Sequence, residues 1–571
     1  MIEKMTRYDF ILLSGKKDAF LDSLGALGVI DITRSSKPVD PVSEGLLSRI
    51  EAMRAEIKRI ENGTDSHLQE LEESRRRLEK EAEDIAVWGD YDSRKIAEMG
   101  LKLRFYCVSE KQFDPAWRGQ CVLQEIQRAK GKVWFVVLGD GEVPATPLPE
   151  PARSSSEVAR QIEIKDKEIE VYKSELEALK GHLPKLRGEL DALGSELNLY
   201  LAGAGAEAAA DNMLLVFEGF APSSENERLA GEFDQLDCLW YSSEAKVDDN
   251  PPIKLKNNKF VRQFELLTDM YGKPDYNEFD PTPYISVFFL LFFAMCMGDA
   301  GYGLLLIVGG LLLRKVKGMK NLAPLVTILG VGTLVVGIVM HTFFGVDISV
   351  LPWVPSWLKS IMITGTIGGF EAQMVLSLAI GIVHLCLAMV VKTVYATRKK
   401  GFLGSLSVWG WTLLIVGGVA LGVLALMELV PSSALKWIVI ALGVISALGI
   451  FLFNDIHRNP LKNIGSGLWE TYNTVTGLLG DVLSYLRLYA LGLAGGMLGK
   501  AFNDIAAMTL GDGSFGFGWI AFVVILIIGH ALNLAMCCLG AFVHPLRLNF
   551  LEFFKNSGYV GKGRTYKPLQ K

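Results

Sequence analysis

Hydrophobic residues divide the chain into two parts with different periodicities. After about residue 281, long apolar runs alternate with short charged loops, the pattern of a protein that crosses a membrane several times. Before that point, apolar positions recur in short alternating segments and in heptads. We therefore predict a soluble region, 1–280, an α-helical transmembrane domain, 281–555, and a C-terminal tail, 556–571. The apolar runs cover residues 283–313, 322–345, 372–391, 402–427, 437–453, 464–499 and 515–550.

The soluble region repeats the order strand, helix, strand three times. Alternating apolar residues predict the strands, and apolar residues three or four apart predict the helices. Each repeat is expected to form a small α/β lobe, so the soluble region belongs to the α+β class. In order of strand, helix and strand, the segments are 7–14, 18–27 and 29–33; 101–109, 115–128 and 132–138; and 213–220, 226–235 and 236–242.

Two heptad segments, at about 44–85 and 155–203, lie between these lobes. A seam of apolar a and d positions this long is typical of a coiled coil. Gly181 and Pro184 interrupt the second segment and should bend it. A homodimeric coiled coil and an antiparallel hairpin within one chain both fit. We favour the antiparallel coiled-coil arm, because the two segments flank a single lobe, which would sit at the end of the arm.

Positive charge in the loops predicts the topology. Lys and Arg follow the first, third and fifth apolar runs and the last one, and such loops are usually cytoplasmic. The start of the chain has no signal-peptide pattern, so we expect the soluble region and the C-terminus in the cytoplasm. Residues 283–313 must then cross an even number of times, with a break near 298–303, which gives eight transmembrane helices. The alternative is one long tilted helix there, with the soluble region outside.

The last two apolar runs, 464–499 and 515–550, are too long for simple crossings. At 1.5 Å per residue each run would extend about 54 Å, against a hydrocarbon core of about 30 Å. We expect these two long helices to be tilted, an arrangement that packing against another element normally imposes.

Composition excludes several classes of function. The seven cysteines form no CxxC pair, which argues against a zinc site and against a disulfide framework. The sequence carries no phosphate loop and no nucleophile motif, so we expect no catalytic site, nucleotide site or cofactor on this chain. The formal net charge of −5 gives no nucleic-acid signal.

Arg487 is the most informative polar residue. It lies in the middle of an apolar run, where a guanidinium costs roughly 3 kcal/mol on insertion scales and does not lose its proton. No carboxylate stands three or four residues away, and Asp481 lies about 120° around the helix. We expect its counter-charge on another helix or another chain. Arg547 is a second candidate, although either arginine could instead extend its charge to the membrane surface.

Other polar side chains inside the apolar runs are candidates for an ion pathway. Intramembrane ionisable residues are functional by default. Asp299 could equally cap a helix after Gly298, and His341, His384 and His530 are expected to pack and to bond helix carbonyls. The pathway candidates are Glu470, Asp481, Ser484, His544, Asp299 and Tyr302.

The segment Ser484–Leu491, SYLRLYAL, resembles the arginine motif of the membrane subunit of rotary V-type and A-type ATPases, called subunit a or subunit I. His544–Phe553 is similar to the last helix of that family and its second arginine, and Met297–Gly303 is similar to its first hairpin. The resemblance covers the whole chain. It does not extend to Gly495, Cys537 and Asn473, where eukaryotic relatives tend to carry a histidine, an acid and a glutamate.

The resemblance implies a stator function without catalysis. A ring of proteolipid subunits would turn against this chain, and Arg487 would favour the ionised form of each ring carboxylate that reaches it. Two half-channels would carry H⁺ or Na⁺, an alternative that the sequence leaves open. The implied partners are the proteolipid c-ring, peripheral stalk subunits of E/G type, a central-stalk cap subunit of d/C type and the bilayer, in a prokaryotic plasma membrane.

Two rival hypotheses come from other classes. A secondary transporter or channel with a regulatory coiled-coil domain would be expected to show internal repeats between its membrane segments, and we find no convincing repeat. A purely structural membrane tether would tolerate replacement of Arg487.

Overall fold

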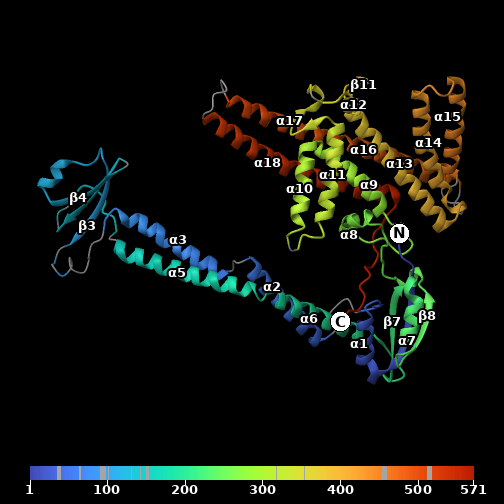
Figure 1. Cartoon of the computed structure of the whole chain (residues 1–571), viewed down its shortest axis with the longest axis horizontal. Coiled ribbons are helices and arrows are strands. Elements are labelled where there is room, and N and C mark those ends of the chain that lie inside the picture. Colours follow the sequence, from blue (N-terminus) through green and yellow to red (C-terminus); the bar gives the residue numbers. More distant parts are fainter. Residues whose placement is uncertain are drawn as a thin grey trace. The chain divides into compact units, whose positions relative to one another are not determined.

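The computed structural model divides the chain into two compact units (Figure 1). The first comprises Met1–Ile11 and Glu218–Pro568, and the second comprises Leu12–Phe217 and Leu569–Lys571. The predicted boundaries at 280 and 555 stay predictions. The structure describes residues 1–34, 40–62, 66–89, 98, 100, 102–129, 131–139, 141, 143–149, 153–316, 318–352, 354–452, 460–510 and 517–570. Residues 63–65 of the first heptad segment, 511–514 of the last weakly charged loop and 571 of the tail lie outside the described residues.

The first and third predicted lobes contribute to one five-stranded sheet of order β2-β7-β1-β8, with β6 paired to β7. Helix α7 covers β1 through Phe233, which packs edge-on against Tyr8 and Phe10. The predicted elements are confirmed, although the second strand is only two residues long. The strands are β1 (Met5–Leu13), β2 (Asp31–Ile32), β6 (Glu207–Ala209), β7 (Leu214–Pro222) and β8 (Leu239–Glu244), and the helices are α1 (Lys17–Leu27) and α7 (Asn226–Phe233).

The middle lobe is an antiparallel sheet of order β3-β5-β4, made by β3 (Leu103–Ser109), β4 (Val122–Ala129) and β5 (Lys132–Leu138). The predicted helix at 115–128 is therefore wrong: only Pro115–Gly119 is helical, as a single 3₁₀ turn. Gly131, at φ 73°, supplies the left-handed turn that folds β4 back onto β5. Pairing with β5 decides the conformation of this segment, and the local pattern does not reveal it.

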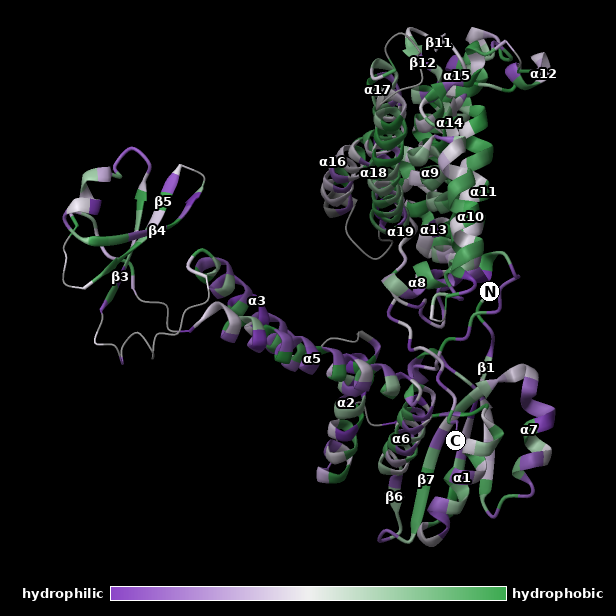
Figure 2. Ribbon diagram, turned by 60° about the vertical axis from the view of Figure 1, so that its left-hand side comes forward, coloured by the Kyte–Doolittle hydropathy of each residue, from purple (hydrophilic) through white to green (hydrophobic). Residues whose placement is uncertain are grey.

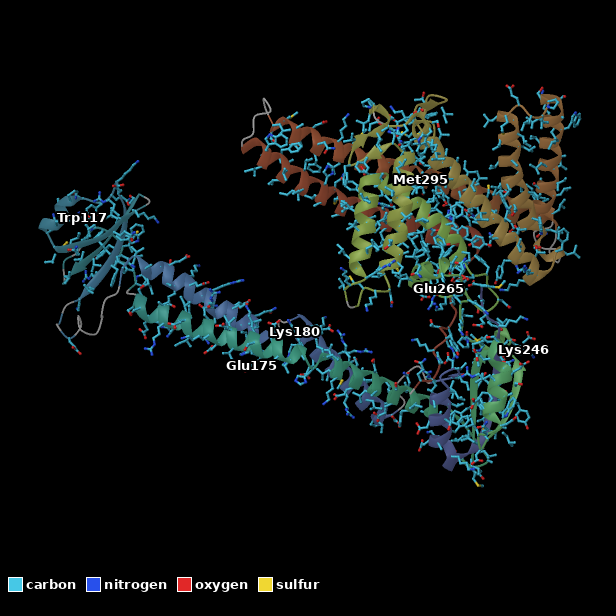
Figure 3. The ribbon with its side chains drawn as sticks, viewed as in Figure 1. Trp117, Glu175, Lys180, Lys246, Glu265 and Met295 are labelled. Carbon is cyan, nitrogen blue, oxygen red and sulfur yellow. The ribbon has the colours of Figure 1, made fainter. Side chains whose placement is uncertain are left out.

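The two heptad segments form antiparallel helix pairs within the chain. Helix α2 packs on α6 and α3 on α5. Arg187 pairs with Glu61, and Lys173 pairs with Glu72 at 3.0 Å, so residue numbers rise on one helix as they fall on the other. Charged residues such as Glu175 and Lys180 lie on the outer surface of α5 (Figure 3). The helices are α2 (Pro41–Asn62), α3 (Ser66–Ala86), α5 (Ser155–Lys180) and α6 (Leu183–Ala204).

The seam between α2 and α6 consists of the predicted heptad residues. Leu46, Ile50 and Leu193 are buried together, with Leu190 and Tyr200 packed against them. The predicted interruption is observed, because α5 ends at Lys180 and α6 begins at Leu183. The structure shows two antiparallel helix pairs. A continuous coiled-coil arm stays a prediction.

Among the described residues, five helical stretches are long and apolar enough to cross a membrane. They contain α13 (Ala372–Lys400), α14 (Leu406–Leu426), α15 (Ser432–Ala447), α16 (Pro460–Ser484) followed by α17 (Leu486–Met508), and α18 (Phe517–Arg547) followed by α19 (Phe554–Ser557). Three shorter apolar helices precede them, α9 (Thr282–Met297), α10 (Ala300–Leu313) and α11 (Ala323–Val339). Figure 2 shows the dense hydrophobic colouring of these helices. Their positions match the predicted apolar runs, and the count of eight crossings stays a prediction.

The predicted break in the first apolar run is observed. Helix α9 ends at Met297, and Gly298 takes the left-handed conformation at φ 60° that closes many helices. Asp299 then caps α10, which runs antiparallel to α11 at close range: a Cβ on Gly337 of α11 would lie 2.2 Å from the backbone nitrogen of Ala300. The run therefore forms two short helices of opposite direction.

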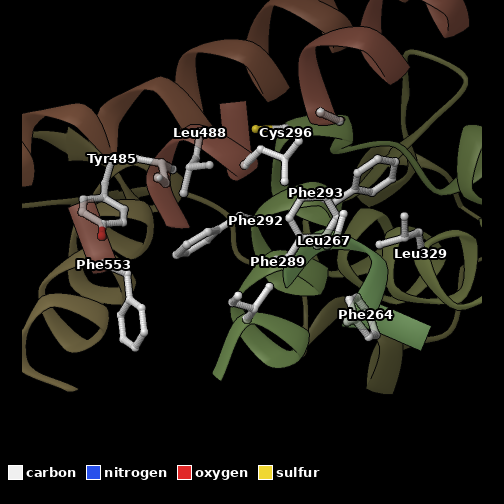
Figure 4. Packing of buried hydrophobic residues seen from close by; sticks show 14 of the residues in the cluster. Phe264, Leu267, Phe289, Phe292, Phe293, Cys296, Leu329, Tyr485, Leu488 and Phe553 are labelled. Carbon is white, nitrogen blue, oxygen red and sulfur yellow. The ribbon is translucent and has the colours of Figure 1, made fainter. Parts of the chain in front are cut away.

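The core of the first unit lies where α9 meets α17 and the end of α18 (Figure 4). Phe292 and Cys296 of α9 pack there with Tyr485, Leu488 and Phe553. All five side chains are at most 2% exposed. This packing fixes the start of α17, which carries Arg487.

Candidate functional site

A break between α16 and α17 positions Arg487. Helix α16 ends at Ser484, and α17 begins at Leu486. Tyr485, at the break, is fully buried, and its hydroxyl shares a 2.9 Å hydrogen bond with Nδ1 of His384 on α13. Its ring occupies the place of a side chain at Gly381, where a Cβ would lie 2.3 Å from the ring. Tyr485 thus anchors the joint to α13, two residues before the arginine.

The guanidinium of Arg487 is incompletely satisfied. Its Nη1 is buried and has no hydrogen-bond partner, and no ion pair joins Arg487 to a carboxylate within the described parts of the chain. His544 of α18 lies within electrostatic range of both Arg487 and Arg547, and its Nδ1 is also buried without a partner. A buried charged donor without an acceptor is costly. Arg487 therefore has unused capacity for an anion.

Arg547 differs from Arg487 in its surroundings. It is the last residue of α18 and is exposed. Glu552 lies within its electrostatic range. An exposed arginine costs little, so both the functional and the surface-extension hypotheses remain open for Arg547.

Asp481 and Ser484 lie in a polar cluster at the end of α16. Asp481 accepts a 2.8 Å hydrogen bond from Asn556 and lies 3.6 Å from Nζ of Lys555. Ser484 lies beside Glu552, which is 3% exposed and whose Oε2 has no hydrogen-bond partner among the described residues. Glu552 is the buried acid that the candidate residues omitted. In the sequence, Glu552 could have been found as an acid just after the apolar run 515–550.

Asp299 has the contacts of a structural cap. Its Oδ1 accepts the backbone N–H groups of Gly301 at 2.8 Å, Tyr302 at 3.2 Å and Phe344 at 2.8 Å, and its Oδ2 accepts that of Gly345 at 2.8 Å. The residue is 1% exposed. Four backbone donors on one carboxylate hold the α9–α10 joint against the turn at 344–345, which supports the capping alternative.

Tyr302 belongs to a buried network that links α10, α17 and α18. Its hydroxyl shares a 2.8 Å bond with Nδ1 of His530 and accepts a 2.8 Å bond from Nδ2 of Asn533. His530 continues through Nε2 to Oδ1 of Asn503 at 3.0 Å, and Asn503 donates to the carbonyl of Phe344 at 2.7 Å. The expectation that His530 bonds a helix carbonyl is therefore wrong. The network ties three helices together.

Glu470 is not part of these clusters along α16. It precedes Arg487 by seventeen residues, roughly 26 Å of helix at 1.5 Å per residue. The structure therefore gathers Asp481 and Ser484 near the start of α17 and leaves Glu470 far along α16.

The architecture defines the class first: a helical membrane protein with an α/β N-terminal region and a half-buried arginine whose Nη1 has no hydrogen-bond partner among the described residues. A model of the V-type ATPase 116kDa subunit family matches residues 162–323 and 468–571, which include Arg487 and Arg547. These two segments of the chain are therefore similar to this family, and the curated relatives support a member of the V-type and A-type ATPase subunit I family.

Curated relatives agree with this assignment. The chain is 31% identical over 388 residues to the A-type ATP synthase subunit I of Methanocaldococcus jannaschii, which covers 62% of this chain and 54% of the relative. It is 34% identical to the Pyrococcus abyssi subunit, covering 57% and 48%, respectively. The V-type ATP synthase subunit I of Borreliella burgdorferi matches over the full length of both chains at 24% identity. The chain thus spans about half the length of the first two relatives.

Proposed function

We propose that the chain is the membrane-embedded stator subunit of a rotary V/A-type ATPase and moves H⁺ or Na⁺ past a rotating proteolipid ring. One observation carries the proposal: Arg487 is held rigidly beside an anchored helix break, while its buried Nη1 has no partner in the described chain. A carboxylate that arrives from a separate subunit would supply the missing acceptor. The relatives, named as subunit I of ATP synthases, support membership in such a complex.

The arginine would act through its fixed charge. A ring carboxylate about 4 Å from the guanidinium would gain about 4 kcal/mol at an effective dielectric constant of 20, which is roughly a thousandfold in proton affinity. The ring carboxylate therefore releases its ion on reaching Arg487. A lysine would do this less reliably, because burial can neutralise an ammonium. The permanent cation also repels ions that would otherwise leak directly between the two half-channels.

The polar cluster before α17 is suited to one of these half-channels. The predicted topology would put Asp481, Ser484 and Glu552 on the cytoplasmic side of Arg487. His544 lies within electrostatic range of Arg487 and Arg547. In the same proposal the chain crosses the membrane eight times, with its soluble region and C-terminus in the cytoplasm.

The soluble region is proposed to bind the peripheral stalks and to contact the central-stalk cap. Antiparallel helix pairs with charged outer surfaces suit an arm that resists torque. ATP would be handled by other subunits. Deletion of residues 46–200 should abolish copurification of stalk subunits while the membrane region still copurifies the ring. Stalk subunits that copurify with the deleted chain would contradict this part of the proposal.

Arg487→Lys in the intact complex tests the central claim. The complex is purified, reconstituted into vesicles and supplied with ATP, and uptake of protons and of ²²Na⁺ is measured in parallel. We expect ion uptake to be lost while native electrophoresis shows an assembled complex. Arg398→Lys makes the same chemical change at an exposed position near the end of α13 and should pump normally. Normal uptake by Arg487→Lys would refute the proposal.

The same vesicles distinguish the rival transporter. A secondary transporter would move its substrate in vesicles that contain this chain alone, without ATP. A stator would show no transport until the ring and the ATP-hydrolysing subunits are added.

A further inference from the structure

We propose that Glu371 is the ion-exchanging carboxylate of the second half-channel, on the side of α17 opposite to the Asp481 cluster, and that it receives its ion through a cavity beside α17. The inference rests on the proposed stator function and assigns a residue to it. The observations are a cavity, a hydrogen bond from α17 and the angular order of residues around that helix.

A cavity of roughly 540 Å³ lies within the first unit, between α17 and the segment that joins α11 to α13. A cavity of this size has room for several water molecules. The connecting segment contains β9 (Thr342–Phe343), β10 (Val346–Asp347), α12 (Ser356–Lys359), β11 (Thr366–Ile367) and β12 (Phe370–Glu371). Figures 1 and 2 place β11 and α12 at one end of the helical bundle. Polar groups that line the cavity come from His341, Asp347, Glu371, Gln373, Tyr489 and Lys500.

Glu371 connects this cavity to the helix that carries the arginine. The residue is exposed and precedes the first residue of α13. Its carboxylate accepts a hydrogen bond from the hydroxyl of Tyr489, two residues after Arg487. The carboxylate is thus open to water on one side and held to α17 on the other.

The two long helices offer no nearer acid on this side of Arg487. Helix α18, from Phe517 to Arg547, contains neither Asp nor Glu. On α17 the first acid after the arginine is Asp504, about 25 Å further along at 1.5 Å per residue. An ion pathway that reaches Arg487 from this end must therefore take its carboxylate from another segment, and Glu371 is an acid that accepts a hydrogen bond from α17.

The order of residues around α17 places Glu371 beside the path of a passing partner. With 3.6 residues per turn, Tyr489 lies about 160° from Arg487 around the helix. The arc between them on one side holds Ala490 and Ala494 within about 60° of Arg487 and Met497 midway between the two ends, and all three are exposed. Small exposed residues let another helix approach closely. A ring carboxylate that crosses this arc would meet Glu371 at one edge and Arg487 at the other, so loading and release occur at separate positions.

The competing explanation is a structural tie, in which Glu371 only holds the loop segment to α17. Two variants separate the alternatives. Glu371→Gln keeps an acceptor for the Tyr489 hydroxyl and removes the exchangeable ion. Tyr489→Phe removes the hydrogen bond and keeps the carboxylate. If Glu371 is only a structural tie, Tyr489→Phe should lower ion uptake and Glu371→Gln should not. If Glu371 exchanges ions, Glu371→Gln should lower ion uptake and Tyr489→Phe should not.

The test uses the intact complex in vesicles, with ATP-driven uptake of protons and of ²²Na⁺ measured as separate arms. We expect Glu371→Gln to lower uptake at least tenfold with assembly preserved, and Glu371→Asp to retain a measurable part of it. Glu428→Gln, which makes the same chemical change at an exposed position after α14 and outside the cavity lining, should stay within twofold of the wild type. Uptake by Glu371→Gln within twofold of the wild type would overturn the inference.

A chemical rescue covers the case in which Glu371→Gln does not assemble. Glu371→Cys is treated with 2-carboxyethyl methanethiosulfonate, which restores a carboxylate at the cavity, and the wild type is treated in parallel because it contains its own cysteines. Recovery of uptake in the Cys variant supports the inference, and absence of recovery in an assembled, labelled complex contradicts it.

If Arg487→Lys abolishes uptake while Glu371→Gln does not, only the inference fails. If Arg487→Lys pumps normally, the stator proposal itself fails.

Discussion

Replacement of Asp299 by asparagine tests whether this buried carboxylate is a structural cap or part of an ion pathway. In the native arrangement Oδ1 accepts three backbone N–H groups and Oδ2 accepts that of Gly345. Asparagine retains one oxygen, which can still face the three donors. Its amide NH₂ then points at the N–H of Gly345, so two donors confront each other where an acceptor stood.

The expected loss follows from these contacts. Leaving the Gly345 N–H unsatisfied costs about 1–3 kcal/mol, and three hydrogen bonds to a charged acceptor become neutral ones, each weaker by about 1 kcal/mol. The uncharged side chain avoids the desolvation cost of a buried carboxylate, which offsets part of this loss. We therefore expect a net local destabilisation of about 3 kcal/mol. Asp299→Ala leaves all four donors without their acceptor and should be worse.

Hydrogen exchange of the detergent-solubilised protein measures the effect where it arises. A local loss of about 3 kcal/mol accelerates exchange by roughly a hundredfold, and the acceleration should appear in peptides that cover 298–303 and 342–346. Asp347→Asn is the matched control, because its Oδ1 accepts the N–H and hydroxyl of Ser349 and lies 3.1 Å from Nδ1 of His341. Native protection in Asp299→Asn, or equal acceleration in the control, would refute the capping assignment and favour the pathway hypothesis for Asp299.

Two further predictions concern the helix joint and the soluble region. Gly381→Ala would place a methyl group 2.3 Å from the ring of Tyr485, so the thermal midpoint and ion uptake should both fall, whereas Gly418→Ala, with open space around it, should be neutral or stabilising. Hydrogen bonds from the Tyr200 hydroxyl and the Ser43 N–H lower the pKa of Asp40 from its ordinary value of 3.8. The stabilisation is complete above that value and is lost as the pH falls through the lower folded pKa, so hydrogen exchange at the start of α2 should accelerate below about pH 4, and Asp40→Asn should remove this pH dependence.

The sequence predicted those helices and breaks that depend only on residues close together along the chain. The apolar runs mark the membrane helices because length and hydropathy alone decide whether a segment suits the hydrocarbon core. The break at Gly298 follows from a left-handed glycine and a capping aspartate in adjacent positions. The strand at Val122–Ala129 was missed, because its conformation depends on pairing with β5 and its residues also suit a helix.

Local sequence patterns could not predict which residues contact and position the helix that carries Arg487. Its position in an apolar run marks it as costly whatever the fold. The residues that position it come from distant segments: Tyr485 bonds His384, and Glu371 accepts from Tyr489, each pair more than one hundred residues apart. The spacing of residues along the chain does not indicate these contacts.

Three acids of the first unit are bound by partners other than Arg487. Asp299 is saturated by four backbone N–H groups, Asp481 is taken by Lys555 and Asn556, and Glu371 accepts from Tyr489 on the far edge of α17. Each acid has a partner that holds it in place, so none of these three is free to swing to the guanidinium without breaking contacts worth about 1–3 kcal/mol apiece. In the proposed stator, a carboxylate from another subunit would supply the acceptor that Nη1 of Arg487 lacks among the described residues.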